Sequence, residues 1–337
     1  MAWRDGADIA EDAVSLLIIN RQTVRDLLPM AACVDLMDEA MSALSRGDTS
    51  QLLRQILPLG GGAAFGVMPG ASPEGFGAKL ISVYPGNFAK GLQSHQGFVA
   101  LFDPASGAPV AILHAGEITA IRTAAASAAA TRALARPDAT RLAILGYGEQ
   151  AETHLHAMAC VRPLSAVAVW GRSPDRAAAF AERMSGHLGI AVESAPSVEA
   201  AVSDADIVCA VSASPEPILE GRWIAPGAHV NLVGSSTAAT READDALVVR
   251  ARLFADHRQG VLAQGGEVIH AMAAGLIDES HVLAEIGEVI AGTRPGRLTD
   301  QDVTVYKSLG AVTQDLYSGW AVYRRALAEG RGTAAPF

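Results

Sequence analysis

The chain has 337 residues, 50% of them hydrophobic and 18% charged, which excludes a disordered chain and suffices for about two domains with a buried core. Its 26 basic and 36 acidic residues give a net charge of -10, which disfavours nucleic acid and anionic membranes as partners. The acidic N-terminus lacks an apolar signal core, and no apolar run is long enough to span a bilayer. Three dispersed cysteines fit neither a disulfide framework nor a metal site, so we expect a metal-free protein of the cytoplasm.

The first part of the chain alternates short apolar runs with turn residues. Residues 14–19 predict a strand, and residues 29–46 predict a helix that begins after Pro29 and ends at Gly47. Further strands are expected at 52–59, 64–68, 76–84, 97–102 and 109–113. Clusters of glycine, proline and asparagine separate these runs, which favours a mostly antiparallel sheet.

A different pattern begins near residue 117. The alanine-rich residues 117–135 predict a long helix. Strands and helices then alternate: strand 141–146, helix 149–160, strand 166–171, helix 174–188, strand 191–195, helix 197–203, and strands 206–212 and 228–234. This alternation predicts a parallel sheet with crossover helices. Residues 278–290 and 302–328 are each predicted as helical.

A glycine-rich turn, residues 146–151 (GYGEQA), lies between a predicted strand and a predicted helix. Gly146 permits the tight turn, and Gly148 lets backbone amides approach a pyrophosphate at the start of the helix, beside Glu149 and Gln150. This context predicts a dinucleotide site. The alternative is a glycine-rich turn without a ligand.

The residues after the second strand of this pattern indicate which dinucleotide is bound. An NAD site usually has an aspartate or glutamate there to bind the ribose 2′-hydroxyl, but this chain has Gly171, followed by Arg172 and Ser173. Arg172 and Ser173 are suited to hydrogen bonds with a 2′-phosphate, so we expect NADP(H). The alternative is that Arg172 is a solvated charge and that NAD(H) is also used.

Several motifs together resemble the ornithine cyclodeaminase/mu-crystallin family over roughly residues 15–328. Besides the glycine turn, they are GAKL at 77–80, YPGN at 84–87, IRTAAAS at 121–127, PGAHVNLVG at 226–234 and VYKSLG at 305–310. The resemblance implies an α/β protein in which a Rossmann-type parallel sheet domain, residues 126–304, is inserted in an α+β domain. That second domain, residues 1–125 plus 305–337, would bind substrate and form a homodimer.

Members of this family include ornithine cyclodeaminases, alanine dehydrogenases and reductases of cyclic ketimines. All transfer hydride between a nicotinamide and the α-carbon of an amino or imino acid, so the protein must hold a carboxylate. By resemblance, Arg54, Lys79 and Arg122 line that substrate site. Arginine offers a fork for a carboxylate, while lysine is a compact charge that can change protonation. Without the resemblance, Arg54 would be interpreted as a surface charge.

The resemblance also implies the residues that contact the cofactor. Ser94 and His95 resemble the mu-crystallin branch and are expected to reach the cofactor or the substrate. Further cofactor contacts are expected at Thr123, Asn231, Val233, Gly234 and Ser308. Lys79, Lys90 and Lys307 are the three lysines of an arginine-rich chain, which favours a specific role for any of them.

Two departures separate this chain from the cyclodeaminases. Where those enzymes have an aspartate after the Val-Gly loop this chain has Ser236, and where they have a glutamate before Met-Pro it has Gly66. Cyclisation needs a base and a partner for the distal ammonium, and these carboxylates are missing. We therefore expect NAD(P)H-dependent reduction of a cyclic α-imino acid, with Ser236 orienting the imine or a water. The alternatives are an ornithine cyclodeaminase and a non-catalytic nucleotide-binding protein.

Overall fold

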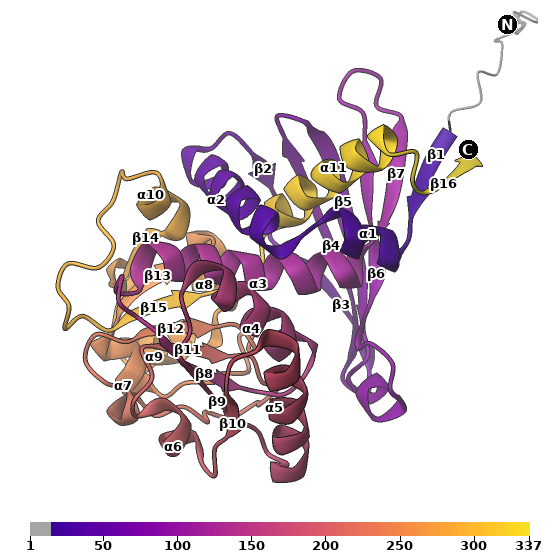
Figure 1. Ribbon diagram of the computed structural model, residues 1–337. Helices are drawn as coiled ribbons and strands as arrows, with labels where there is room; N and C mark the ends of the chain where they lie inside the picture. The colour runs from indigo at the N-terminus through magenta and orange to yellow at the C-terminus, as the bar shows by residue number, and fades with distance from the viewer. Residues whose placement is uncertain (1–14) are drawn as a thin grey trace, which may run out of the picture.

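A computed structural model describes residues 15–337, except for the side chains of residues 88 and 89. Two sheets of eight strands each form the two halves of the molecule, and helix α3 (Ala115–Leu134) runs between them (Figure 1). The predicted fold class is confirmed: one half is a parallel α/β unit, and the other packs helices on a largely antiparallel sheet.

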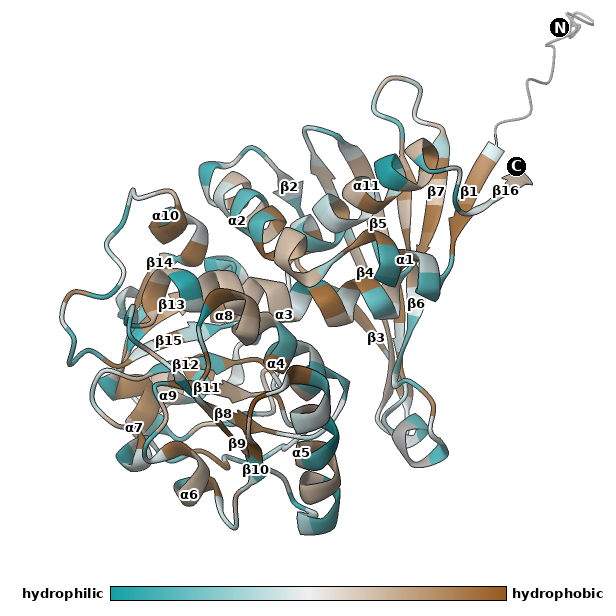
Figure 2. Ribbon diagram, in the orientation of Figure 1, coloured by the Kyte–Doolittle hydropathy of each residue, from teal (hydrophilic) through white to brown (hydrophobic). Residues whose placement is uncertain are grey.

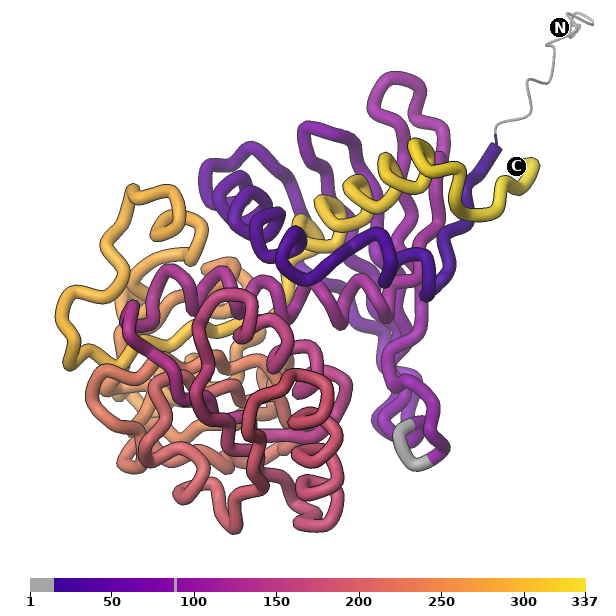
Figure 3. The backbone as a smooth tube through the Cα atoms, in the orientation of Figure 1, coloured from indigo at the N-terminus to yellow at the C-terminus, as the bar shows by residue number. Residues whose placement is uncertain are grey.

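The largely antiparallel sheet gathers strands from both ends of the chain. Its strands are β1 (Ser15–Ile19), β2 (Ser50–Gln51), β3 (Gln55–Gly60), β4 (Ala63–Ser72), β5 (Gly75–Val83), β6 (His95–Phe102), β7 (Pro109–His114) and β16 (Thr333–Pro336). They lie in the order β16-β1-β7-β6-β5-β4-β2, with β3 paired to β4, and only β1 and β7 are parallel. The tube in Figure 3 shows how the C-terminal strand returns beside the first one.

Helices cover one face of this sheet. They are α1 (Arg21–Leu27), α3 and α11 (Val312–Ala328), and α2 (Met30–Arg46) packs on α3 and α11, while a short 3-10 turn, η1 (Pro85–Lys90), joins β5 to β6. The predicted limits of α2 are confirmed, because Pro29 is its N-cap and Gly47 ends it with a φ of 79° in the left-handed region.

The parallel sheet has the strand order of a dinucleotide-binding fold. Its order is β10-β9-β8-β11-β12-β15-β13-β14, and every neighbouring pair is parallel. The strands are β8 (Arg141–Leu145), β9 (Ala166–Trp170), β10 (Val192–Ser194), β11 (Ile207–Ala210), β12 (His229–Leu232), β13 (Arg252–Ala255), β14 (Val282–Glu285) and β15 (Thr304–Lys307). The helices are α4 (Glu149–Val161), α5 (Pro174–Leu188), α6 (Val198–Val202), α7 (Asp245–Arg250), α8 (Arg258–Gln264), α9 (Gly266–Ala273) and α10 (Ile286–Ile290). The hydrophobic strands lie among helices that carry hydrophilic residues outward (Figure 2).

Two predicted helices are wrong in part. Residues 302–328 contain the buried strand β15 followed, after Gly310 with a φ of 85°, by helix α11. Residues 278–290 contain a 3-10 turn (η3, Glu279–His281), strand β14 and the short helix α10. Strand β15 is buried on both faces, and such an apolar run is not separated from a helix by periodicity. Strand β14 is different, because it has only four residues and Leu283 on it is exposed.

The expected domain limits fall inside two elements. The limit between residues 304 and 305 cuts β15, which pairs with β12 and β13, so the chain leaves the parallel sheet only after Lys307. The limit between 125 and 126 falls within α3. The division into a substrate-binding and a nucleotide-binding domain stays a prediction.

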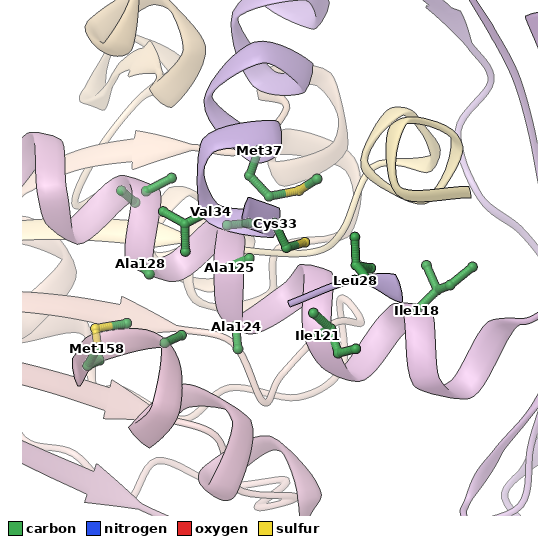
Figure 4. Packing of buried hydrophobic residues seen from close by; sticks show 14 of the residues in the cluster. Leu28, Cys33, Val34, Met37, Ile118, Ile121, Ala124, Ala125, Ala128 and Met158 are labelled. Atoms are coloured by element: carbon green, nitrogen blue, oxygen red, sulfur yellow. The ribbon is translucent and has the colours of Figure 1, made fainter. Parts of the chain in front are cut away.

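Helix α3 is the central packing element of the molecule. Figure 4 shows α3 between the side chains of Cys33, Val34 and Met37 from α2 and that of Met158 from α4. Its many alanines let both helices approach closely, and a helix buried all round needs no polar face. This position places Arg122, on α3, where the two halves meet.

Candidate active site

The glycine turn has the geometry of a dinucleotide site. Gly146 has a φ of 142°, and a Cβ there would lie 2.9 Å from the Val211 carbonyl oxygen, so only glycine fits. Gly148 is the N-cap of α4, with no side-chain cap and no atom within 4 Å of the place a Cβ would take. The buried Oε1 of Gln150 has no hydrogen-bond partner. The uncapped start of α4, with open space at Gly148, suits the phosphates of a dinucleotide. The unpaired acceptor of Gln150 suits one of its hydroxyl groups.

The end of β9 lacks a carboxylate at the position that would face the ribose. Gly171 is buried there, Arg172 is exposed, and the Ser173 hydroxyl accepts a hydrogen bond from the Arg176 amide at 3.5 Å as the N-cap of α5. Ser173 therefore has a helix-capping role that the sequence analysis did not predict.

Lys79, Arg122 and Asp315 form a buried ionic cluster from three elements. The Lys79 Nζ lies 3.2 Å from Asp315 Oδ1 on α11, and Arg122 Nε on α3 donates to the same oxygen at 3.0 Å. Arg122 also donates to Gln314 Oε1 at 2.9 Å. Lys79 and Arg122 are each only 3% exposed, so both charges lie in a region of low dielectric.

Burial sets the proton affinity of Lys79. The pKa of the Lys79 ammonium is lowered from 10.5 to about 8, chiefly by burial and also by the charges of Arg122 and Arg54, while Asp315 opposes the shift. A lysine in this environment exchanges a proton near neutral pH, which an arginine does not.

Arg54 joins the two halves of the molecule. Its guanidinium donates to the Ser236 carbonyl oxygen and, at 3.1 Å, to Gln264 Oε1, both of which belong to the parallel-sheet half. The Nε of Arg54 and the Nε2 of Gln314 are buried donors without a partner. Two unpaired donors beside an excess of cations over carboxylates suit a carboxylate-bearing ligand.

Ser94 and His95 follow Gln93, which contacts the glycine turn at Glu149. The Ser94 hydroxyl is 2.9 Å from His95 Nδ1, and the neighbouring Gln93 donates to Glu149 Oε1 at 2.6 Å. Although His95 is exposed, its pKa falls to about 4, because the protein around the ring disfavours the charged form and Lys79 and Arg54 add positive charge. His95 is therefore neutral at pH 7.

A second buried ionic group lies beneath the loop that carries Ser236. The Lys307 Nζ is 2.8 Å from Glu267 Oε2 and donates to the Ser235 carbonyl oxygen at 2.6 Å. Glu242 accepts from the Gly234 amide at 2.6 Å and from the Ser212 amide and hydroxyl at 2.7 Å each. Burial raises the pKa of the Glu242 carboxyl, whereas its hydrogen bonds and Lys307 lower it.

The structure also shows the surroundings of the remaining predicted residues. Ser236 reaches Arg54 through its backbone carbonyl, and Gly234 has no space for a side chain, because a Cβ would lie 2.0 Å from the Ser212 carbonyl oxygen. Asn231 is buried in the core and donates to Thr131 at 3.0 Å. Thr123 and Ser308 are buried and Val233 is half-buried, and the Ser308 hydroxyl has no hydrogen-bond partner.

The sequence analysis missed four polar side chains of these clusters: Gln314, Asp315, Glu242 and Glu267. The signal for Gln314 and Asp315 was their place near the start of α11, between Val312 and Leu316, where buried polar residues need a partner. Within residues 15–337, no group of histidine, cysteine and acidic side chains is suited to a metal ion, and no helix is long and apolar enough to cross a membrane.

A parallel sheet with a glycine turn, next to buried cations that suit a carboxylate, defines an NAD(P)-dependent oxidoreductase. The chain belongs to the ornithine cyclodeaminase/mu-crystallin family, whose model matches residues 15–330.

Three known proteins illustrate the similarity. Mouse ketimine reductase mu-crystallin is 37% identical over 280 residues, which are 82% of this chain and 85% of that protein. The structure of Thermococcus litoralis Δ1-pyrroline-2-carboxylate reductase in complex with NADH and L-proline is 35% identical, with a TM-score of 0.92 over 94% of this chain and 99% of that one. An archaeal alanine dehydrogenase dimer with bound NAD is 28% identical, with a TM-score of 0.91 over 96% and 99%.

Proposed function

We propose that this protein reduces a cyclic α-imino acid, such as pyrroline-2-carboxylate, to the cyclic amino acid with NAD(P)H. The observation that carries the proposal is the meeting of Arg54, Lys79 and Arg122 beside the loop that follows β12, with unpaired donors on Arg54 and Gln314. The mouse ketimine reductase and the archaeal pyrroline-2-carboxylate reductase support the choice of substrate class.

In this proposal the two arginines bind the substrate and the lysine transfers a proton. Arg54 and Arg122 bind the substrate carboxylate, and Asp315 holds the Arg122 guanidinium and the Lys79 ammonium in fixed orientations. When bound, the reduced nicotinamide supplies the hydride that adds to C2 of the imine. Lys79 supplies the proton that the ring nitrogen gains, directly or through a water oriented by Ser236, and its pKa of about 8 suits that transfer.

The positions of Gly66 and Ser236 argue against a cyclodeaminase. A Cβ at Gly66 would lie 3.2 Å from Ile56 Cδ1 and 3.3 Å from Ile81 Cγ2, so apolar side chains fill the place where a glutamate would meet a distal ammonium. At Ser236 the group that faces Arg54 is a neutral carbonyl and not a carboxylate. Neither position offers the base that cyclisation needs.

We further propose that NADPH is preferred over NADH. The support is the exposed Arg172 directly after the uncharged Gly171, where a 2′-phosphate would meet a cation and a 2′-hydroxyl would find no carboxylate.

We also propose a homodimer formed through the open face of the antiparallel sheet. Directly paired residues place Leu57 next to Phe65, and Leu80 between Val67 and Phe98, on the face opposite Lys79. Leu57 is 60% exposed and Phe98 is 38% exposed. Such an apolar face needs a cover, and the dimeric alanine dehydrogenase supports a second copy of the chain.

A cytoplasmic location agrees with the cysteines. Cys33, Cys160 and Cys209 are all unpaired thiols, and two of them are buried. Free thiols are typical of a reducing compartment.

The decisive test of the function is NADPH oxidation with a panel of substrates. Pyrroline-2-carboxylate or piperideine-2-carboxylate should be reduced, while pyruvate with ammonia or methylamine tests acyclic imines. Ornithine with NAD should release no ammonia. The variant Lys79→Met is the matched control, because it keeps the volume of the side chain and removes the proton.

Two results would reject the proposal. Robust formation of proline from ornithine would establish the cyclodeaminase, and binding of NADPH without turnover of any imine would establish a non-catalytic binding protein.

A further inference from the structure

We propose that Tyr147, the residue between the two glycines of the turn, determines the preference for NADPH over NADH together with Gly171. The inference rests on the proposed dinucleotide-dependent function and concerns a side chain that the glycine pattern treats as free to vary.

The first observation is that the Tyr147 ring occupies the space next to Gly171. A Cβ at residue 171 would lie 2.1 Å from Tyr147 Cδ1 and 2.3 Å from Tyr147 Cε1, and the third nearest atom also belongs to that ring. Gly171 is not among the glycines with a positive φ, so its backbone would accept other residues. In this conformation the aromatic ring therefore leaves no room for a side chain at residue 171.

The second observation is the place of Gly171 in the fold. It follows Trp170, the last residue of β9, which lies beside β8 in the parallel sheet. An acidic residue at this point accepts the hydrogen bond of the ribose 2′-hydroxyl in NAD-dependent proteins. Tyr147 fills the volume of that acidic side chain, so the chain cannot use this means of binding NADH while the ring stays in place.

The third observation is the charge around the ring. The Arg176 guanidinium carbon lies 5.9 Å from the centre of the Tyr147 ring, within the range of a cation–π contact, and Arg172 follows Gly171 directly. The ring that leaves no room for a carboxylate at residue 171 thus also contacts a cation on α5. Arg172 suits a 2′-phosphate, while position 171 offers no carboxylate to a 2′-hydroxyl.

The proposal predicts that residues 147 and 171 act as a coupled pair. Binding of NADPH and NADH, without imine, should be measured by calorimetry for the wild type, Tyr147→Ala, Gly171→Asp and the double variant. The dissociation constant of NADH divided by that of NADPH should fall about tenfold in Tyr147→Ala, because the cation–π contact that holds Arg176 is lost. Gly171→Asp alone should bind both dinucleotides poorly, because the new side chain meets the ring.

The double variant is the most informative protein. It should bind NADH at least about tenfold more tightly than Gly171→Asp alone, since removing the ring frees the new carboxylate to accept from the ribose. Tyr147→Phe is the matched control: it keeps the ring and should keep the wild-type ratio. Circular dichroism verifies that each variant is folded, and if Gly171→Asp does not fold, the two Tyr147 variants alone test the proposal.

Three outcomes would overturn the inference. They are an unchanged ratio in Tyr147→Ala, a lost preference in Tyr147→Phe, or equal NADH affinity in Gly171→Asp and the double variant. Failure of the proposed function would look different, because the wild type would then bind NADPH and reduce no imine.

Discussion

The burial of the Lys79 ammonium follows from its position on strand β5. On β5 it shares the buried face with Gly77 and Ile81, while Ala78 and Leu80 point to the open face. A lysine on the covered face loses its hydration, and only the shared carboxylate of Asp315 compensates. This arrangement keeps the ammonium available for proton transfer without leaving it unpaired.

The lowered pKa of Lys79 predicts how activity varies with pH. If Lys79 donates the proton, the active form is the ammonium, so kcat/KM should fall as the pH rises through about 8, the pKa of the free enzyme. Rate measurements from pH 6 to 10 at a fixed NADPH concentration would reveal the bend. Lys79→Arg keeps the charge but does not titrate in this range. A bend near pH 8 that persists in this variant would assign the titration to another group.

Arg172 provides the second prediction for a single residue. Arg172→Ala should weaken NADPH binding by about 1.5–3 kcal/mol, the contribution of a hydrogen bond to a charged group, and should leave NADH binding nearly unchanged. The exposed Arg141, at the amino end of β8, is the matched control, because that end of the strand lies opposite the glycine turn. Equal losses for both dinucleotides in Arg172→Ala would show that Arg172 does not contact the phosphate.

At the scale of elements, the carboxyl ends of three neighbouring strands are tied together by Lys307, Glu267 and Glu242. Lys307 ends β15, Ser212 follows β11, and Gly234 follows β12. The same loop holds Arg54 through the Ser236 carbonyl. The buried ionic group therefore supports the loop that joins the two halves at the site.

This ionic group predicts a non-additive effect on stability. Lys307→Met should lower the free energy of unfolding by about 3–5 kcal/mol, because the Glu267 carboxylate stays buried without its partner. The double variant Lys307→Met with Glu267→Gln should recover part of the loss, since no isolated charge remains. Urea denaturation measures both. Losses that simply add would contradict a direct interaction between the two side chains.

The elements also show what the sequence could and could not predict. The glycine turn and the strands and helices from 141 to 188 follow from local patterns, and so do the limits of α2. Strand β15 was missed because it is buried on both faces. Gln314 and Asp315 could not be assigned to the site because their partners, Lys79 and Arg122, are far away in sequence and meet them only in the folded chain.

At the scale of the whole molecule, the open face of the antiparallel sheet predicts the assembly. Leu57→Asp combined with Phe98→Asp should convert a dimer into a monomer, because two carboxylates would have to be buried in an apolar interface. Light scattering at micromolar concentration gives the mass. Leu276, which is 51% exposed and follows α9 in the other half, is the control position for the same substitution. A monomeric wild type would reject the proposed dimer.

The central claim, hydride transfer to the α-carbon of a cyclic imino acid, is tested most directly by the fate of a label. NADPH that carries deuterium at both C4 positions of the nicotinamide should be incubated with pyrroline-2-carboxylate, and the proline formed should be analysed by mass spectrometry and NMR. The account predicts one deuterium at C2 of the proline that the wild type forms. The variant Lys79→Met should form little proline. Proline without deuterium at C2, or no proline at all, would contradict it.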